Sequence, residues 1–405
     1  MSRSLIARSA DLCRLSDEGY EVSVLGGNLV VGNVPYVNSR GEVRHGALVS
    51  ELTLRGDRTA PPSSHVAYFR GDCPCDRSGV PLVKVVLDGQ RPYRVTADLV
   101  ARYTLSSKPP GAAGYPDYYT KMITYAAILG IHAQSVAPDT SAQPPDASPP
   151  AGLPVADATQ ETPFRYVDTA SGRAGIGPIS GKLAVPRIAI VGLGGTGSYI
   201  LDLVAKTPVA EVHLFDGDRF LQHNAFRAPG APTAEQLGRQ PLKVDYLSAM
   251  YSPLRRGIVP HPYPVDVGNV ADLDDMTFVF LAIDDGAAKQ EIIRHLEARQ
   301  TPFIDVGLGV YEVGGCLAGL IRTTLSTEPD AWRDAARARI SLGPRDAAGP
   351  YDRNIQVADL NALAAALAVI AWKKLMGFYN DLAHEYFTAY AIDTNSLVND
   401  LPPNP

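Results

Sequence analysis

The sequence predicts two domains, a smaller α+β domain followed by a larger α/β domain. Strand-like runs between two helices come first, a proline-rich stretch interrupts the chain, and strands that alternate with helices come after it. With 405 residues and 45% hydrophobic side chains, the chain is long enough to build two cores. We expect an accessory domain at residues 1–134, a linker at 135–164 and the α/β domain at 165–405.

The first domain is expected to begin and end with a helix. Residues 5–15 form the opening helix, and residues 118–129 form the closing one, with Tyr118, Met122, Tyr125 and Leu129 on a single face that favours core packing. Between them lie apolar runs bounded by Gly, Pro, Asn or Ser, at residues 20–25, 28–32, 47–54, 65–69 and 82–87. Ubiquitin-conjugating domains share this order of elements with many other α+β folds.

The expected linker is defined by composition. From Pro138 to Pro163 there are seven prolines mixed with Ala, Asp, Ser and Thr. A stretch with so few large apolar residues cannot bury enough surface to fold by itself, so we expect it to be extended and mobile.

The second domain contains an apolar run, Arg187–Val191, that breaks into a glycine-rich loop and then a helix. The loop carries Gly192, Gly194, Gly195 and Gly197. Glycines allow the backbone to turn sharply and to approach a phosphate, and the free N–H groups at the start of the helix attract anions. The loop therefore predicts a phosphate-binding site.

The residues after the loop distinguish two kinds of nucleotide site. A second apolar run ends at Asp216, nineteen residues after Gly197, where a Rossmann dinucleotide-binding unit places its ribose-binding acid. These features alone favour a nicotinamide oxidoreductase. Asp218, Asn224 and Arg227 come next, and an amide and a guanidinium in this place are typical of an enzyme that handles a triphosphate.

These motifs resemble those of the adenylyltransferase family that includes ThiF, MoeB and the ubiquitin-activating enzymes. The shared pattern is GxGGxG, then Asp-x-Asp, then Asn-x-x-Arg, then an acid that closes a later apolar strand. Its matches here are Gly192 to Gly197, Asp216 with Asp218, Asn224 with Arg227, and Asp284. The resemblance covers about residues 165–395 and implies a Rossmann-like, ThiF/MoeB-type adenylation domain. The N-terminal part resembles a domain of unknown function that accompanies ThiF-like domains.

The resemblance implies a role for each matched residue. The four glycines contact phosphates, Asp216 and Asp218 bind the nucleotide with Asp216 on the ribose hydroxyls, and Asp284 lies near the Mg²⁺ of MgATP, a role that suits a hard carboxylate ligand. Asn224, Arg227 and Lys243 contact the phosphates. Lys243 lies two residues beyond the family's Gly-x-x-Lys spacing, so Arg239 is an alternative.

The family also uses an arginine that precedes the glycine-loop strand and often comes from the partner subunit of a dimer. In this chain Arg173 is the first candidate and Arg165 the second. We expect Arg173 to act on the departing pyrophosphate, within its own subunit or across a homodimer. The expected catalytic residues are therefore Arg173, Arg227, Lys243 and Asp284.

Two departures from the family limit the expected chemistry. Ubiquitin-activating enzymes transfer the acyl group to a cysteine in the crossover segment, but no cysteine follows Cys316, which we expect to be a core residue of a hairpin. The two CxxC pairs of MoeB-type zinc sites are also missing. The chain thus resembles a minimal activator that delivers its acyl adenylate directly or uses a hydroxyl within 325–350. The hydroxyl candidates are Ser326, Thr327 and Ser341.

Cysteines in the first domain offer an alternative acceptor. Cys73 and Cys75 are too close in sequence for a zinc pair, but either thiolate could take an acyl group if nearby positive charge, for example from His65, lowered its pKa. We favour a structural turn around Pro74. Cys13, at helical spacing from core positions, is expected to be buried.

Composition excludes several function classes. The net charge of −6 argues against a general nucleic-acid surface. Four cysteines, with no leader sequence, indicate a reducing cytoplasm rather than a disulfide framework. The longest uncharged helical run, residues 362–372, is far shorter than the roughly 20 residues that span a bilayer, so we expect no membrane association.

The sequence therefore predicts ATP-dependent adenylation of the C-terminal carboxylate of a ubiquitin-like or sulfur-carrier protein, in a bacterial ubiquitin-like modification pathway. The expected cofactors are ATP and Mg²⁺, and the expected partners are that protein, a ubiquitin-conjugating-like protein and a second copy of the chain. Three alternatives remain: adenylation of a small or tRNA-borne carboxylate, nucleotide binding without turnover, and a dinucleotide oxidoreductase.

Overall fold

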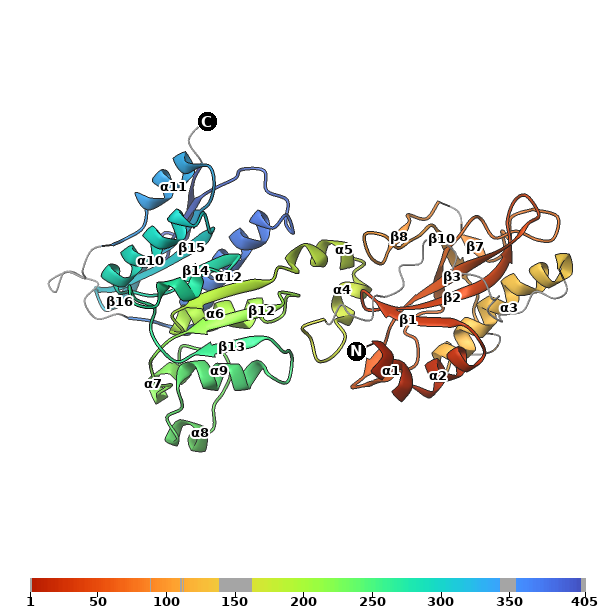
Figure 1. The fold of residues 1–405 in the computed structure, drawn as a ribbon, viewed down its shortest axis with the longest axis horizontal. Coiled ribbons are helices and arrows are strands. Elements are labelled where there is room, and N and C mark those ends of the chain that lie inside the picture. The colour runs from red at the N-terminus through yellow and green to blue at the C-terminus, as the bar shows by residue number, and fades with distance from the viewer. Residues whose placement is uncertain are drawn as a thin grey trace. The chain divides into compact units, whose positions relative to one another are not determined.

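The computed structural model describes residues 2–87, 89–109, 111, 113–137, 162–342 and 355–401, and side chains from residue 4 onward. The chain divides into two compact units, Met1–Gly181 and Lys182–Pro405 (Figure 1). Most of the expected linker, residues 138–161, lies outside the described residues. Both units have the predicted class: the first is built on an antiparallel sheet and the second on a mixed, largely parallel one.

The first unit contains a six-stranded sheet, one long helix and four short helices among its described residues. Its sheet has the order β1-β2-β3-β6-β10-β7, with antiparallel neighbours throughout. The helices are α1 (Ser2–Arg8), α2 (Ala10–Asp17), α3 (Tyr118–Val136), α4 (Thr169–Arg173) and α5 (Gly177–Ser180). The strands of this sheet are β1 (Glu21–Leu25), β2 (Asn28–Val37), β3 (Val43–Glu51), β6 (Val66–Arg70), β7 (Val86–Leu87) and β10 (Tyr103–Ser106). Two further pairs are β4 (Leu54–Arg55) with β5 (Arg58–Thr59), and β8 (Tyr93–Arg94) with β9 (Val100–Ala101).

Helix α3 packs along β2 and β3, and the four residues predicted for its core face are all buried. The Tyr118 hydroxyl donates to the backbone oxygen of Glu51, 2.8 Å away, which ties the helix to β3. Two expectations were wrong. The opening helix is interrupted at Ser9, whose extended backbone separates α1 from α2, and of residues 82–87 only Val86–Leu87 form a strand, because residues 83–85 form a turn.

Helix α4 belongs to the first unit. A Cβ on Gly172 would lie 2.8 Å from the backbone oxygens of Gly26 and Gly27, so the helix rests directly on the β1–β2 turn. The Tyr93 hydroxyl also donates to the backbone oxygen of Gly172, at 2.8 Å. These contacts extend the first unit to Gly181, beyond the boundary expected at residue 165.

The second unit contains an eight-stranded sheet of order β13-β12-β11-β14-β15-β16-β17-β18. Strands β11 to β15 are parallel, and the remaining pairs are antiparallel. The strands are β11 (Arg187–Val191), β12 (Glu211–Phe215), β13 (Ile258–His261), β14 (Phe278–Leu281), β15 (Phe303–Val313), β16 (Cys316–Ser326), β17 (Phe387–Ala391) and β18 (Ser396–Asp400). The helices are η1 (Gly181–Leu183, which begins at the last residue of the first unit), α6 (Gly195–Val204), α7 (Gln222–Ala225), α8 (Ala234–Gly238), α9 (Lys243–Tyr251), η2 (Val270–Leu273), α10 (Gly286–Ala298), α11 (Asp330–Arg337) and α12 (Ala358–Leu375).

Both faces of this sheet are covered, which explains why its central strands are apolar without alternation. On β11, Ile188 and Ile190 join the core made with α6, α9 and α12, while Ala189 and Val191 join the core on the opposite face with α10. In the sheet, β11 has β12 on one side and β14 on the other, so the chain runs outward from β11 in one direction and later continues in the opposite direction. The carboxyl ends of β11 and β14 therefore meet at a topological switch point, where α/β sheets bind ligands.

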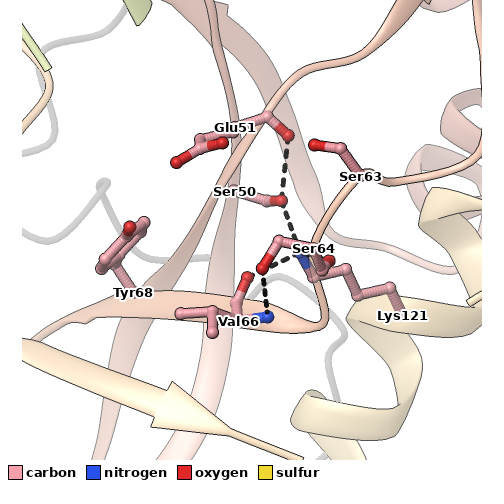
Figure 2. Close-up of a pocket in the computed structure, with 7 residues that line it drawn as sticks. All are labelled: Ser50, Glu51, Ser63, Ser64, Val66, Tyr68 and Lys121. Atoms are coloured by element: carbon pink, nitrogen blue, oxygen red, sulfur yellow. Dashed lines mark hydrogen bonds between the residues drawn. The ribbon is translucent and has the colours of Figure 1, made fainter. Parts of the chain in front are cut away.

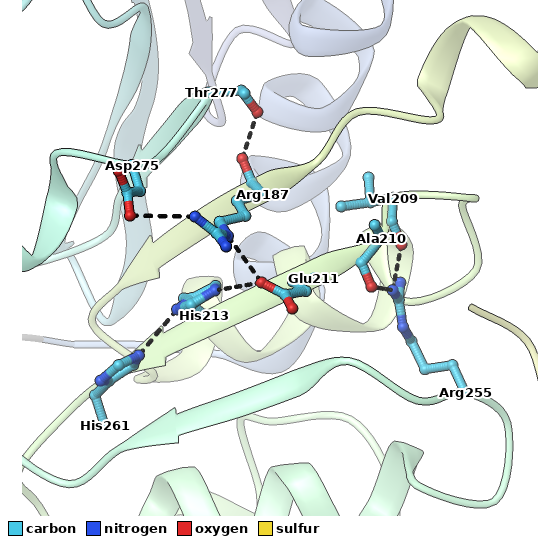
Figure 3. Close-up of polar contacts among 9 residues, drawn as sticks. All are labelled: Arg187, Val209, Ala210, Glu211, His213, Arg255, His261, Asp275 and Thr277. Atoms are coloured by element: carbon cyan, nitrogen blue, oxygen red, sulfur yellow. Dashed lines mark hydrogen bonds and ion pairs between the residues drawn. The ribbon is translucent and has the colours of Figure 1, made fainter. Parts of the chain in front are cut away.

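A network of polar contacts runs along β12, from the start of β11 and β12 to the end of β13 (Figure 3). Arg187 donates from Nε to Glu211 at 2.9 Å, and His213 bridges Glu211 to His261. Arg255, 1% exposed, donates to backbone oxygens that precede β12, and burial lowers its pKa to about 10. Arg187, Glu211 and Arg255 thus lie at the strand ends away from the glycine loop, whereas His261 lies at the carboxyl end of β13, opposite Phe215. Among the described helices, none combines the length and the apolar character that crossing a membrane would require.

Candidate active site

The expected site residues of the second unit come after the carboxyl ends of its parallel strands. Phe215, Val191, Leu281 and Asp305 lie in register across β12, β11, β14 and β15. Asp216 comes directly after β12, the glycine loop comes directly after β11, and Asp284 comes three residues after the end of β14. The sheet thus brings together motifs that are separated by up to 92 positions in the sequence, from Gly192 to Asp284.

The glycine loop has no room for side chains at three of its four glycines. Gly192 has a φ of +89°, and a Cβ there would lie 2.6 Å from the backbone oxygen of Ala282. At Gly197 a Cβ would lie 1.9 Å from the backbone oxygen of Gly192, and at Gly195 it would lie 2.0 Å from Asn361 Nδ2. These glycines are needed for the loop to close onto β14 and α12.

Gly194 differs, because nothing lies within 4 Å of the position of its Cβ. It is the N-cap residue of α6, so the helix N-terminus begins directly after it. The first N–H groups of a helix lack intrahelical partners and carry partial positive charge. Open space beside such groups is where a phosphate can approach the loop.

Asp216 is tied to the glycine loop and to Lys243. Its Oδ2 accepts from the backbone N–H of Leu193 at 2.7 Å and lies 3.2 Å from Lys243 Nζ, while its Oδ1 accepts from the N–H of Asp218. Lys243 begins α9, is buried, and also donates to Asp218 at 2.7 Å. Asp218 is 77% exposed at its side chain, so it is the carboxylate of this trio that faces solvent.

Lys243, rather than Arg239, contacts the two aspartates that follow β12. Arg239 follows α8 and pairs with Glu235 on the surface. The two extra residues in the Gly-to-Lys spacing therefore do not prevent Lys243 from reaching the two aspartates.

Asn224 and Arg227 lie in and just after the short helix α7. The side-chain oxygen of Asn224 accepts from the N–H of Leu221, and the residue is buried. The Nε of Arg227 is buried without a hydrogen-bond partner in the part of the chain that the structure describes. Burial lowers the pKa of Arg227, and the charge of Asp284 opposes this. A half-buried guanidinium with an unused donor is suited to an anionic ligand.

Two adjacent carboxylates after β14 have different environments. Asp285 is the N-cap of α10 and accepts from the N–H groups of Ala287 and Ala288. Asp284 is exposed and lies close enough to Arg227 to affect its pKa. Among the described residues, no three His, Cys, Asp or Glu side chains cluster as a preformed metal site. The donor set suits Mg²⁺, which commonly binds one or two carboxylates together with substrate phosphates and water.

Asn361 was not predicted as a site residue, because in the sequence it marks only the start of a helix. It is fully buried; its Oδ1 accepts from Thr196 Oγ1 at 3.0 Å, and its Nδ2 donates to the backbone oxygen of Arg227 at 3.3 Å. It therefore connects the glycine loop to the arginine segment. The available signal was a single amide directly before the long apolar run of this helix.

A buried ion pair, Lys289 with Asp305, was not predicted either. Their charged atoms are 2.7 Å apart and both side chains are 6% exposed. Burial raises the pKa of Asp305, against the effect of Lys289. The pair joins α10 to β15, where Asp305 lies in register with Leu281, the last residue of β14.

The candidate arginines Arg173 and Arg165 lie in the first unit. Arg173 is the last residue of α4 and is exposed, and Arg165 is also exposed. An arginine on α4 is therefore carried by the first unit and not by the unit that contains the glycine loop.

The acyl-acceptor candidates have mixed environments. Cys316 was expected in the core, but it is exposed, because β16 begins at Cys316 while its pairing with β17 begins only at Leu320. Cys75 is buried. Its burial, and to a smaller extent the nearby Cys73, raises the pKa of its thiol to about 11, whereas an activated thiolate needs a lowered pKa. Cys13 is half-buried rather than buried.

The hydroxyl candidates also differ in exposure. Ser326 is 2% exposed, Thr327 is half-buried and Ser341 is exposed. Residues 343–350 of the candidate segment lie outside the described residues.

Comparisons with known proteins match each unit separately. Residues 10–169 match a domain of unknown function, DUF6791, and residues 177–319 match the ThiF family. Among curated proteins, none matches the chain.

Solved structures similar to this chain include PaaA, with 16% identity, a TM-score of 0.42, and coverage of 55% of this chain and 75% of PaaA. Escherichia coli MccB with ATP has 14% identity and a TM-score of 0.41, and covers 56% of this chain and 66% of MccB. Structural similarity at these identities and TM-scores does not indicate a ligand or a substrate for this chain. Residues 177–319, which lie almost entirely in the second unit, therefore match the ThiF family.

Proposed function

We propose that this chain uses MgATP to adenylate the C-terminal carboxylate of a ubiquitin-like or sulfur-carrier protein. The observation that carries the proposal is the arrangement at the switch point of the sheet. An open helix N-terminus at Gly194, the buried Lys243 and the unused Nε of Arg227 belong to segments that come after neighbouring strands. Together they supply the donors and positive charge that a triphosphate requires.

ATP fits the residues present. The N–H groups after Gly194 would contact the phosphates, and Asn224, Arg227 and Lys243 would bind them with charged or amide donors. Asp216 and Asp218 would accept from the ribose hydroxyls. Because Asp216 already accepts from Leu193, it would also keep the loop in the binding conformation.

The reaction needs positioning and charge neutralisation more than acid–base catalysis. A carboxylate oxygen attacks the α-phosphorus, the bond from that phosphorus to the bridging oxygen breaks, and pyrophosphate leaves with the electron pair. The carboxylate is already ionised at neutral pH, so no base is required. Arg227 and Lys243, with Arg173 supplied by the first unit of the same or a second copy, would stabilise the developing charge.

Asp284 is the residue that would hold Mg²⁺. The ion would neutralise phosphate charge, and Arg227 beside Asp284 would place the guanidinium next to the same phosphates. Asp285 caps α10, where it accepts from the N–H groups of Ala287 and Ala288.

The protein substrate and the homodimer rest on the family resemblance, as does a ubiquitin-conjugating-like partner. A cytoplasmic location rests on cysteine usage alone. The alternatives are adenylation of a small or tRNA-borne carboxylate, and nucleotide binding without turnover.

The test is ATP–pyrophosphate exchange by the purified full chain, measured with and without ubiquitin-like proteins encoded beside its gene. Exchange that requires such a protein, and that disappears when its last residue is amidated, supports the proposal. Exchange with free carboxylic acids or tRNA alone would favour the second function. MgATP binding without exchange under any of these conditions would indicate a scaffold and overturn adenylation.

A further inference from the structure

The first unit contains a buried polar cluster in which the hydrogens of a lysine match its acceptors (Figure 2). Lys121 Nζ lies 2.8 Å from Ser50 Oγ, 2.9 Å from the backbone oxygen of Ser64 and 2.6 Å from that of Val66. Burial lowers the pKa of Lys121 to about 8, against the charge of Glu51, so the ammonium keeps its three hydrogens at pH 7. Each hydrogen has an acceptor, and the cluster is complete.

Among the described residues, the second unit contains a polar cluster that is one hydrogen short. It runs from Glu211 through His213 and His261 to Tyr263 and Asp272, with successive contacts of 3.3, 3.0, 3.0 and 2.8 Å; Figure 3 shows the first three residues. Each of these four contacts needs one hydrogen. Two neutral imidazoles and one hydroxyl supply three, and the carboxylates supply none.

The missing hydrogen does not come from the ends of the cluster. Arg187, and then His213, lowers the pKa of Glu211, so this carboxylate is ionised at neutral pH. Asp272 is exposed to solvent, where a carboxyl group is also ionised. Burial, and then the hydrogen bond to Asp272, raises the pKa of Tyr263, so the hydroxyl keeps its only hydrogen and donates it to Asp272. The fourth hydrogen therefore belongs to an imidazole.

An imidazolium at His213 completes the cluster. It donates from Nε2 to Glu211 and from Nδ1 to Nε2 of His261. The His261 ring, still neutral, then donates from Nδ1 to the Tyr263 oxygen. Burial, and then the nearby His213, lowers the pKa of His261 against the charge of Asp272, which disfavours a second proton on the pair. A second proton would also direct two N–H groups at each other.

This cluster ends beside Asp216. The His261 ring stacks on Phe215, with ring centroids 4.1 Å apart and an interplanar angle of 5°. The backbone oxygen of His261 accepts from the N–H of Asp216 at 3.3 Å, and the Asp216 carboxylate accepts from Leu193 in the glycine loop. A shift of His261 would therefore move Asp216 and, through it, the loop.

Given the proposed function, in which Asp216 binds the ribose of MgATP, we propose that His213 and His261 are positioning residues that hold Asp216 in place while the pair carries one added proton. Without this proton one contact of the cluster has no hydrogen. With a second proton the two rings repel each other. MgATP should therefore bind most tightly in an intermediate range of pH and more weakly on both sides of it.

The added proton can be located without nucleotide. The full chain is labelled with nitrogen-15 histidine, and the ring signals of the pair are assigned with His213→Gln and His261→Gln. At pH 7 we expect one ring with hydrogens on both nitrogens and one ring with a single hydrogen, whereas an exposed histidine is mostly neutral at this pH. Two neutral rings at pH 7 would overturn the proposal whether or not the chain binds nucleotide.

The coupling to the site is measured by calorimetry of MgATP binding between pH 6 and pH 9. Glutamine at position 213 can form hydrogen bonds but cannot hold the added proton. We expect His213→Gln to bind MgATP about tenfold more weakly than wild type at pH 7, and the two proteins to converge at pH 9. The other charged groups at the cluster are Arg187 and its partner Asp275, residue types that do not ordinarily titrate in this range.

His295→Gln is the matched control and should follow wild type at every pH. The His295 ring also contacts a carboxylate, that of Asp274 at 2.7 Å, but it belongs to α10. Because MgATP itself titrates near neutral pH, each affinity is compared with that of this control at the same pH.

Histidines that only pack against Phe215 give a different result. In that case the ratio of affinities between wild type and His213→Gln stays constant with pH, and the proposal is overturned. If His213→Gln does not fold, wild type alone decides: the pH at which the ring loses its added proton must coincide with the pH at which the affinity falls. No MgATP binding at any pH would instead overturn the proposed nucleotide site, a result distinct from binding that ignores the proton.

Discussion

The side chain of Asn361 lies against the backbone of Gly195, with no space for a methyl group between them: a Cβ on Gly195 would lie 2.0 Å from Asn361 Nδ2. The same amide contacts Thr196 and the backbone of Arg227. The conformation of the glycine loop is thus set by a residue more than 160 positions away in the sequence.

Gly195→Ala should destabilise the second unit by about 1–3 kcal/mol, because the added methyl must displace a buried, hydrogen-bonded amide. Asn361→Ala removes the obstacle, so the double variant should lose less stability than the sum of the single variants. Denaturant unfolding of the four proteins measures this coupling. Additive losses would show that the two residues do not constrain each other.

Gly194→Ala should leave stability nearly unchanged but weaken nucleotide binding, in contrast to Gly195→Ala. Its methyl would enter open space, so unfolding should change little, but it would occupy the approach to the helix N-terminus. We expect the affinity for MgATP to fall by about tenfold, or 1.4 kcal/mol, in calorimetry. If affinity is unchanged while the fold is intact, the phosphates do not bind at this loop.

Asp284→Asn should reduce pyrophosphate exchange by at least about 100-fold while leaving the fold intact, because an amide is a poorer Mg²⁺ ligand than a carboxylate. Asp285→Asn is the matched control: asparagine also caps helices, and this residue is occupied by α10. If both variants lose exchange activity equally, the effect comes from the start of α10 and not from loss of a Mg²⁺ ligand.

The stability of the first unit should depend on Lys121 above neutral pH. Its pKa is 10.5 in an unfolded chain and about 8 in the folded protein, so between these values the unfolded state binds more protons and stability rises with pH. Relative to Lys121→Met, wild type should gain roughly 3 kcal/mol from pH 7 to pH 11. Urea unfolding of both proteins at both pH values measures this difference. If the difference in unfolding free energy between wild type and Lys121→Met does not change with pH, Lys121 keeps its proton in the folded protein.

A variant with Cys13, Cys73, Cys75 and Cys316 replaced by Ala or Ser should still catalyse pyrophosphate exchange, because the proposed site contains no thiol. Any covalent adduct with a protein substrate should resist thiol reductants and yield to hydroxylamine, as an oxyester does. A reductant-sensitive adduct that is lost on Cys73→Ala would instead make the first unit a thiol acceptor. In wild type, exposed Cys316 should be alkylated fastest and buried Cys75 slowest.

The sequence by itself determined the class of both units and the strand ends of the candidate site. Glycine spacing, unbroken apolar runs such as Arg187–Val191 and the acids after them are local signals, because backbone freedom and hydrophobic periodicity act over a few residues. The core face of α3 was predictable for the same reason. Only the tertiary structure decided that Asn361 supports Gly195, that Lys243 pairs with Asp216, that α4 belongs to the first unit, and that Lys121 meets Ser50. Each of these depends on side-chain packing between segments far apart in the chain, which the pattern of a single segment does not encode.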